Sequence, residues 1–136
     1  MTIDELIENF ELFDEWEDRY RYLIDLGREM PPLDDAYKVD AFKVEGCMSQ
    51  VWLVPSPAES GVLRFRADSD SAIVKGLVAV LLILYSGRTA REILDTDIEG
   101  VFARIGLDQH ISPNRRNGFY AMVETIRGTA RRMAAA

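Results

Sequence analysis

The sequence has few of the residues from which metal centres and disulfides are built. Its 136 residues include one cysteine and one histidine. A single cysteine cannot form an intramolecular disulfide, and sites made of several thiolates or several imidazoles need more of them. The composition therefore argues against a cysteine-only zinc site, a cysteine-ligated iron–sulfur cluster and a multi-histidine metal site, and we expect no metal in this chain.

Positive charge is also scarce, since 16 Lys and Arg face 23 Asp and Glu for a net charge of −7. A general nucleic-acid-binding protein needs a basic face that displaces counterions, so this class is disfavoured. The imbalance is local, because residues 1–40 carry 13 acidic and 4 basic side chains. A solvated acidic face on N-terminal helices explains this, and attraction of a basic partner is the alternative.

Long apolar segments are absent as well. The longest apolar run, 77–85, is far shorter than the roughly 18 residues that span a bilayer. The first residues lack the basic stretch and apolar core of a secretory signal. With 48% apolar and 29% charged residues, we expect a single globular domain over residues 1–136, soluble and cytoplasmic, with no membrane contact and a reduced thiol.

Capping patterns predict helices at both ends of the chain. Residues 2–5 have the spacing of a capping box and open one helix. A second box at 14–17 opens another, which Gly27 is expected to end. Pro31-Pro32 excludes helix beyond that point. Further helices are predicted in the second half of the chain: 72–85 after cap residues 68–71, a short one capped by Thr89, one from Asp97 to Ile105, and one from Ser112-Pro113 toward Met133.

Three strands are predicted between these helices, at 42–45, 50–54 and 62–67. The second is rich in β-branched and aromatic residues and is expected to end at the turn Pro55-Ser56-Pro57. The third alternates apolar residues with Arg64 and Arg66, which is typical of a strand with one buried face. The predicted fold class is α+β, a small antiparallel three-stranded sheet packed on one side by helices, with the nearly all-apolar helix 72–85 buried.

Cys47 is the strongest candidate for chemistry. It follows Gly46 between two predicted strands, where a glycine can take backbone angles that present the next residue to a partner. The alternative is that Cys47 is a small buried apolar side chain. A thiol with an ordinary pKa of about 8.5 is only a few per cent thiolate at neutral pH, so it reacts slowly unless a partner brings a reactive sulfur to it.

Other polar residues have structural explanations beside chemical ones. His110 could pair with Cys47, with Asp108 or Asn114 as the orienting group, yet its surroundings read as a loop between helices. Three further candidates also have both a chemical and a structural explanation. Asp68 and Asp70 suit either acid–base chemistry or helix capping, Arg115-Arg116 suit either an anion or solvent, and Trp52 suits the core better than ligand stacking.

Residues distributed along almost the whole chain form, by their order and spacing, a pattern typical of one protein family. They are Asn9-Phe10, Trp16-Glu17, Tyr20, Tyr22, Ile24, Leu26-Gly27, Val44, Gly46-Cys47, 49–52, 68–70, 72–77, Gln109-His110, Ser112-Pro113, Arg115, Gly118 and Met122. In these residues the chain resembles the SufE family of sulfur-acceptor proteins, the partners of cysteine desulfurases in iron–sulfur cluster assembly.

The resemblance implies a function. Cys47 would accept sulfane sulfur from the persulfide of a SufS-like cysteine desulfurase, stimulate that enzyme, and pass the sulfur to a SufB-like Fe–S scaffold. Pyridoxal phosphate belongs to the desulfurase, and the acceptor carries no cofactor; it is a sulfur carrier and activator rather than a stand-alone enzyme. The fold is shared with a scaffold family that needs three cysteines, and the single cysteine here separates the two.

The resemblance also implies two groups of site residues. The active-site loop around Cys47 would consist of Gly46, Met48, Ser49 and Gln50. A second group would either contact the partner or hold the fold, namely Asp68, Asp70, Lys75, His110 and Arg115. We further expect Met48, Val51 or Trp52 to pack near the Cys47 sulfur.

Three alternative functions remain at this stage. A non-catalytic adaptor would use the acidic helices, with Cys47 incidental. A Cys–His enzyme, such as a hydrolase, requires His110 beside Cys47. A thiol redox sensor requires a depressed thiol pKa.

Overall fold

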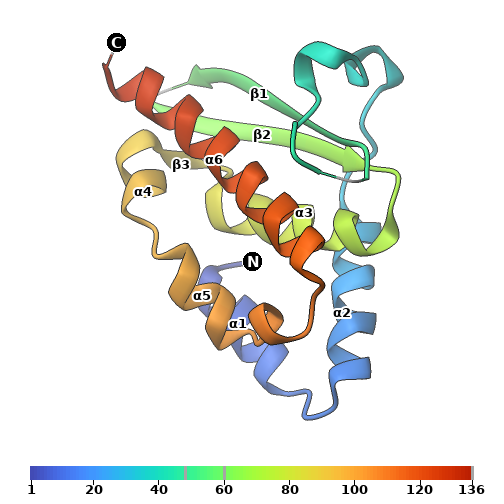
Figure 1. Ribbon diagram of the computed structural model, residues 1–136. Helices are drawn as coiled ribbons and strands as arrows, with labels where there is room; N and C mark the ends of the chain where they lie inside the picture. The colour runs from blue at the N-terminus through green and yellow to red at the C-terminus, as the bar shows by residue number, and fades with distance from the viewer. Residues whose placement is uncertain (48, 60, 136) are drawn as a thin grey trace.

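The fold combines helices with one small sheet, as the computed structural model in Figure 1 shows. The structure describes residues 1–47, 49–59 and 61–135, without the side chains of 57–59, 108 and 135. The α-helices are α1 (Ile3–Glu11), α2 (Trp16–Glu29), α3 (Ala72–Tyr85), α4 (Ala90–Asp95), α5 (Ile98–Arg104) and α6 (Pro113–Ala135). The strands are β1 (Val51–Glu59), β2 (Val62–Ser69) and β3 (Arg88–Thr89), and the 3-10 turns are η1 (Asp35–Tyr37), η2 (Asp40–Phe42) and η3 (Leu107–Gln109).

The sheet is antiparallel with the strand order β1-β2-β3. In β2, Leu63, Phe65 and Ala67 are buried, while Arg64 and Arg66 between them are exposed. The alternation predicted from the sequence is therefore confirmed, and one face of the sheet packs on α3. The α+β class with a three-stranded antiparallel sheet is confirmed too.

Two of the strand predictions are wrong in detail. The segment 42–45 contributes one bridge, between Lys43 and Trp52, because η2 precedes it and Gly46 turns the chain away with a φ of 90°. The second strand continues through Pro55 to Glu59. On this edge strand Pro55 is paired with Phe65, whose own N–H donates to Ser86 Oγ and not to β1, so the missing proline N–H interrupts no ladder hydrogen bond. The third strand of the sheet is β3, which pairs with the start of β2.

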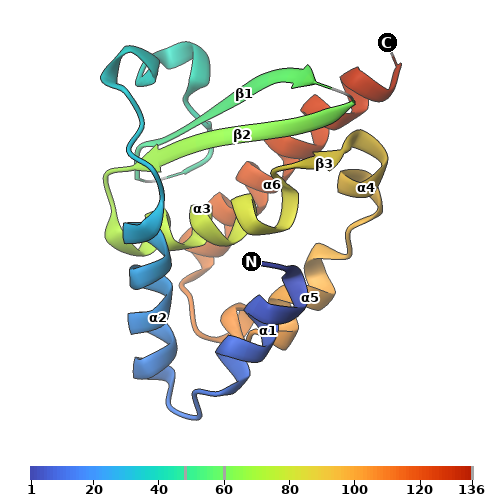
Figure 2. The same cartoon turned by 180° about the vertical axis from the view of Figure 1, so that it is seen from behind.

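Helix α3 lies at the centre of the core. Its buried residues occupy nearly every side of the helix: Val74, Gly76, Leu77, Val78, Ala79, Val80, Leu81, Leu84 and Tyr85. Figures 1 and 2 show α3 beneath the sheet, with α6 alongside it, α2 crossing one end, and α1 with α5 forming the layer farthest from the sheet. The prediction of a buried central helix is confirmed.

Two glycines set the close crossing of α2 and α3. A Cβ on Gly27 would lie 2.8 Å from the backbone nitrogen of Gly76, and a Cβ on Gly76 would clash with the Leu23 carbonyl oxygen. The prediction that Gly27 ends its helix is therefore wrong, because this glycine is needed for packing inside α2. The helix continues to Glu29 and ends before Pro31.

Most of the predicted helix starts are confirmed. Thr2 accepts a hydrogen bond from Glu5 N–H, Thr89 forms a full capping box, and Asp97 caps α5. The capping box predicted at 14–17 is wrong, although a helix does start there, because α2 begins without a side-chain cap. The turn before α2 is held instead by Arg19 Nε, which donates to the Phe13 carbonyl. Ser71, rather than Asp68 or Asp70, caps α3.

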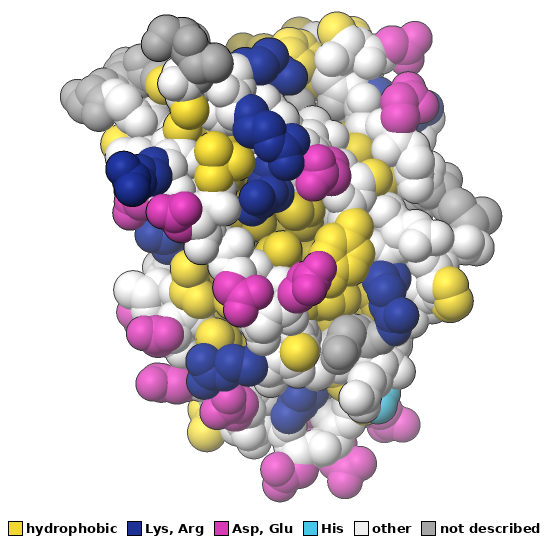
Figure 3. Space-filling view, turned by 60° about the vertical axis from the view of Figure 1, so that its left-hand side comes forward, with side chains coloured by type: hydrophobic (Ala, Val, Ile, Leu, Met, Phe, Trp, Pro, Cys, Tyr) yellow, Lys and Arg dark blue, Asp and Glu magenta, His cyan; other side chains and the backbone are white. Residues whose placement is uncertain are grey.

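Surface charge is distributed unevenly over the molecule. On the face in Figure 3, acidic side chains predominate toward the end where α1 and α2 meet, away from the sheet. This agrees with the acidic surplus of residues 1–40. None of the described helices is long and apolar enough to cross a membrane.

The helix crossing yields a stability prediction. Gly76→Ala should lower the free energy of unfolding by about 1–3 kcal/mol, because the added methyl group meets backbone that cannot rotate away. Urea denaturation followed by circular dichroism measures the change. The matched control is Gly128→Ala in α6, where the nearest atom, Arg132 Nη1, lies 3.7 Å from the added carbon. The control should be neutral or stabilising by up to about 1 kcal/mol. Equal stabilities for the two variants would contradict the packing argument.

Candidate functional site

Cys47 lies at the tip of a loop whose two ends are tied together. At the start of the loop, Val44 N–H donates to the Val51 carbonyl at 2.9 Å. At its end, Gln50 N–H donates to Asp70 Oδ1 at 3.0 Å, and Asp70 N–H donates to the Gln50 carbonyl at 3.2 Å. The base of the loop is therefore fixed by the sheet and by Asp70, whose role in the structure is to hold this loop.

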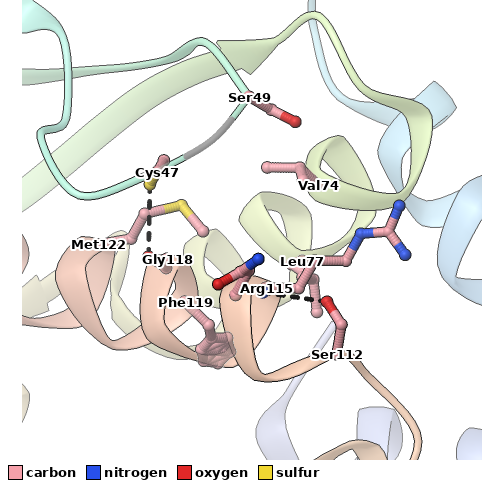
Figure 4. A pocket seen from close by; sticks show the side chains of 10 residues that line it. Cys47, Ser49, Val74, Leu77, Ser112, Arg115, Gly118, Phe119 and Met122 are labelled. Carbon is pink, nitrogen blue, oxygen red and sulfur yellow. Dashed lines mark hydrogen bonds between the residues drawn. The ribbon is translucent and has the colours of Figure 1, made fainter.

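The tip of the loop rests on α6. Cys47 Sγ lies 3.5 Å from the Gly118 carbonyl oxygen, to which the thiol donates. Gly118 is buried, and a Cβ there would lie 3.3 Å from Cys47 Sγ. One turn further along α6, a Cβ on Gly46 would lie 3.3 Å from the Ala121 methyl carbon. We call the surface formed by Gly118 and Ala121 the α6 seat, and it holds Cys47 partly buried (Figure 4).

A cavity of about 340 Å³ opens beside the Cys47 sulfur. In addition to Cys47, it is lined by Ser49, Val74, Leu77, Ser112, Asn114, Arg115, Gly118, Phe119 and Met122. Leu77, Phe119 and Met122 form an apolar floor supplied by α3 and α6 (Figure 4). A space of this size beside the sulfur has room for an additional sulfur atom on Cys47.

Of the three residues expected near the sulfur, neither Val51 nor Trp52 lines the cavity. Val51 is fully buried in the core, and Trp52 lies under Lys38 at 5.7 Å rather than beside the cavity. Met48, which was expected both in the active-site loop and near the sulfur, lies outside the described residues. The apolar side chains that line the cavity come from α3 and α6.

Burial raises the pKa of the Cys47 thiol above its ordinary value. The low dielectric of the protein interior disfavours the thiolate, and the thiol form donates to the Gly118 carbonyl. This shift favours the protonated form of Cys47, which reacts more slowly than the thiolate. A redox-sensor cysteine requires the opposite shift.

Asp68 is a buried carboxylate at the end of β2 with two lysine partners. It is 9% exposed. Its Oδ2 lies 3.2 Å from Lys38 Nζ, and its Oδ1 lies 3.4 Å from Lys75 Nζ and accepts from Ser69 N–H at 2.8 Å. Burial acts to raise the pKa of Asp68, but the Ser69 hydrogen bond and the two lysines outweigh it and leave that pKa below its ordinary value. Through Lys38, which follows η1, and Lys75 on α3, Asp68 thus ties β2 to both segments beside the loop.

His110 lies apart from Cys47. Its ring stacks on Trp16 with 4.1 Å between the ring centroids, and it lines a different cavity together with Asp14 and Arg19. Tyr20 donates to the His110 carbonyl at 2.6 Å. Among the described residues no hydrogen bond joins the imidazole to the thiol, so the Cys–His pairing lacks its geometry. The Asp108 side chain lies outside the described residues.

Arg115 and Ser112 stand where the loop before α6 meets the cavity. Ser112 Oγ accepts from Arg115 N–H at 3.3 Å and caps α6, as the sequence predicted. The Arg115 side chain is exposed and extends away from Cys47 toward α3 (Figure 4). Arg115 and Ser49 both line the cavity. The structure thus brings Cys47, Ser49 and Arg115 to one cavity, and it places Asp68, Asp70 and Lys75 at the base of the loop.

Sequence reasoning gave no structural role to Gly118. The available signal was a glycine inside a predicted helix, where it costs about 1 kcal/mol relative to alanine and so calls for a packing reason. In the described part of the chain, no group of three His, Cys, Asp or Glu side chains is arranged to hold a metal ion.

Comparisons with known proteins agree with one another. A family model named SufE and described as "Fe-S metabolism associated domain" matches residues 4–130. An uncharacterized SufE-like protein of Rhizobium meliloti is 43% identical over 132 residues, covering 95% of this chain and 94% of its own. A second, from Rhizobium etli, is 44% identical over 138 residues, covering 99% and 93%. The solution structure of a hypothetical protein from Thermus thermophilus has a TM-score of 0.79 at 18% identity, covers both chains completely, and shows the same fold.

The ion pairs of Asp68 with Lys38 and Lys75 predict a pH-dependent contribution to stability. Asp68→Asn should lower the free energy of unfolding at pH 7 by about 1–3 kcal/mol, since hydrogen-bonded charge partners are lost. Because the pKa of Asp68 is lower in the folded protein than its unfolded value of about 3.9, this contribution is complete above that value. The difference between wild type and variant should therefore shrink as the pH falls below about 4. Urea titrations at several pH values measure it.

The control for this prediction is Asp35→Asn. Asp35 also pairs with Lys38, at 3.3 Å, but its side chain is 95% exposed, so its removal should have little effect. A stability difference for Asp68→Asn that stays constant between pH 7 and pH 3 would contradict the assignment.

The buried thiol predicts a shifted reactivity profile. The rate of iodoacetamide alkylation of Cys47 in the native protein should rise with pH through a higher apparent pKa than in the urea-unfolded protein, because only the thiolate reacts. Measuring the rate between pH 6 and pH 11 gives both values. An apparent pKa equal to or below the unfolded value would show that the thiol is not held in the α6 seat.

Proposed function

The chain belongs to the SufE family, and from this membership we propose that it is a sulfur-transfer protein in which Cys47 accepts sulfur from a cysteine desulfurase. The family places the chain in Fe–S metabolism, and the SufE resemblance read from the sequence is confirmed. The observation that carries the finer proposal is the position of the sole cysteine, at the tip of a loop beside a cavity of about 340 Å³.

The proposed reaction needs one nucleophile. The Cys47 thiolate attacks the terminal sulfur of the persulfide on the desulfurase cysteine. A bond forms between the Cys47 sulfur and that terminal sulfur, the original S–S bond breaks, and the desulfurase cysteine leaves as a thiolate. The transferred sulfur keeps its oxidation state, so the step needs neither a base triad nor a metal, and the proton lost by Cys47 passes to the leaving thiolate or to solvent.

The geometry suits a carrier that reacts only with its partner. Burial keeps Cys47 protonated in the free protein, which limits its attack on other electrophiles. Docking must draw Cys47 off the α6 seat and into the partner, where a more polar environment or a base generates the thiolate. Between partners the cavity beside Cys47 shields the terminal sulfur from small thiols.

The remaining parts of the proposal follow from the family. The donor is a SufS-like desulfurase, whose pyridoxal phosphate stays on that enzyme, and this chain contributes no cofactor. Removal of sulfur by Cys47 frees the desulfurase cysteine and so stimulates turnover. The sulfur then passes to a SufB-like Fe–S scaffold, and we place the reaction in the cytoplasm.

A non-catalytic adaptor is the second candidate. The acidic surplus of residues 1–40 favours it, because such a surface attracts a basic partner without any role for Cys47. The two functions differ in whether sulfur is found on this chain, so one experiment separates them.

The test is the mass of the intact protein after incubation with a cysteine desulfurase and cysteine, without reductant. Wild-type protein should gain one sulfur atom, and Cys47→Ser should gain none, because the variant has no thiol to form a persulfide. Binding of both proteins to the desulfurase is measured in parallel. Binding without sulfur gain by the wild type, with several desulfurases tried, would establish the adaptor instead.

A further inference from the structure

Gly118 is the α6 residue to which the Cys47 thiol donates its hydrogen bond, and its missing side chain is what allows the contact. A Cβ at this position would lie 3.3 Å from Cys47 Sγ and 3.7 Å from both Cα and Cβ of Cys47. The first distance is shorter than ordinary van der Waals contact. A side chain at Gly118 therefore requires Cys47 to move away by a few tenths of an ångström or more.

The loop, rather than the helix, gives way in that competition. Helix α6 is anchored in the core by the buried residues Phe119, Met122, Val123 and Ile126. Among the described residues, the Cys47 tip is held on the helix by one thiol hydrogen bond and by packing on Gly118 and Ala121, and thiols are weak donors. Gly46 beside it has a φ of 90°, a conformation open mainly to glycine, so the tip has a neighbour that tolerates changes in backbone angle.

We propose that Gly118 is a positioning residue whose lack of a side chain keeps Cys47 on the α6 seat, and so sets how far the free protein shelters its thiol and any sulfur that it carries. The part about the thiol concerns the chain alone. The part about carried sulfur rests on the proposed function. Gly118 touches the reacting residue but takes part in no bond that forms or breaks.

The direction of the effect follows from the contacts. Gly118→Ala should displace Cys47 toward solvent, where its thiolate is better solvated. Alkylation at neutral pH should then become faster, by about tenfold for each unit by which the apparent pKa falls. A persulfide on Cys47 should also be lost sooner, since a small thiol attacks its terminal sulfur, forms its own persulfide and leaves Cys47 as a thiol.

The experiment compares wild type, Gly118→Ala and Gly128→Ala. Gly128 lies on the same helix, and alanine there meets only Arg132 Nη1, at 3.7 Å. Both substitutions raise helix propensity equally, so a general effect on α6 moves both variants in the same direction. The readouts are the pH profile of iodoacetamide alkylation without any partner, the urea midpoint, and the lifetime of the Cys47 persulfide in the presence of a small thiol.

Faster alkylation with a lower apparent pKa in Gly118→Ala, and a wild-type profile in Gly128→Ala, support the proposal. A native urea midpoint with unchanged alkylation in Gly118→Ala overturns it. If Gly118→Ala does not fold, Ala121→Val replaces it, because the larger side chain presses on Gly46 from the same seat, and the same two outcomes apply. Failure of the wild type to gain sulfur refutes the proposed function alone, since the alkylation profiles do not depend on a desulfurase.

Discussion

The burial of α3 is the constraint on which the candidate site depends. Because α3 is apolar on nearly every side, other elements must cover it all round, and they do so with α2 at the Gly27–Gly76 crossing, β2 above and α6 alongside. This arrangement fixes α6 next to the end of the sheet from which the Cys47 loop emerges. The α6 seat and the apolar floor of the cavity are thus a consequence of how the core is closed.

The loop combines a firmly held base with a loosely held tip. At the base, backbone hydrogen bonds and the Asp70 carboxylate fix Val44, Gln50 and Val51, and the Asp68–Lys75 pair secures the adjoining strand to α3. At the tip, the contacts of Cys47 with the described part of the chain are one weak hydrogen bond and packing against Gly118. We therefore expect loss of the tip contacts to cost less free energy than loss of the base, which would allow Cys47 to leave the helix while the surrounding fold stays intact.

Local patterns predicted most of the helices, because capping boxes and apolar periodicity depend on neighbours in sequence. Predictions failed where distant segments decide the outcome. Gly27 looks like a helix stop until Gly76 is seen to cross it, and Pro55 looks like a strand end until β1 is known to be an edge. For the site, the sequence identified Cys47 and the family, but the α6 seat required knowing that residue 118 lies under residue 47.

The structure also explains why a lone cysteine suffices for the proposed chemistry. A stand-alone cysteine enzyme needs a base beside its thiol, whereas here burial raises the pKa of Cys47 and His110 is stacked on Trp16. A carrier has the opposite requirement, since its thiol must stay unreactive until a partner supplies both the electrophilic sulfur and the environment that generates the thiolate. In the proposed reaction, the features that weaken Cys47 as a general nucleophile are therefore those that would make it selective as an acceptor.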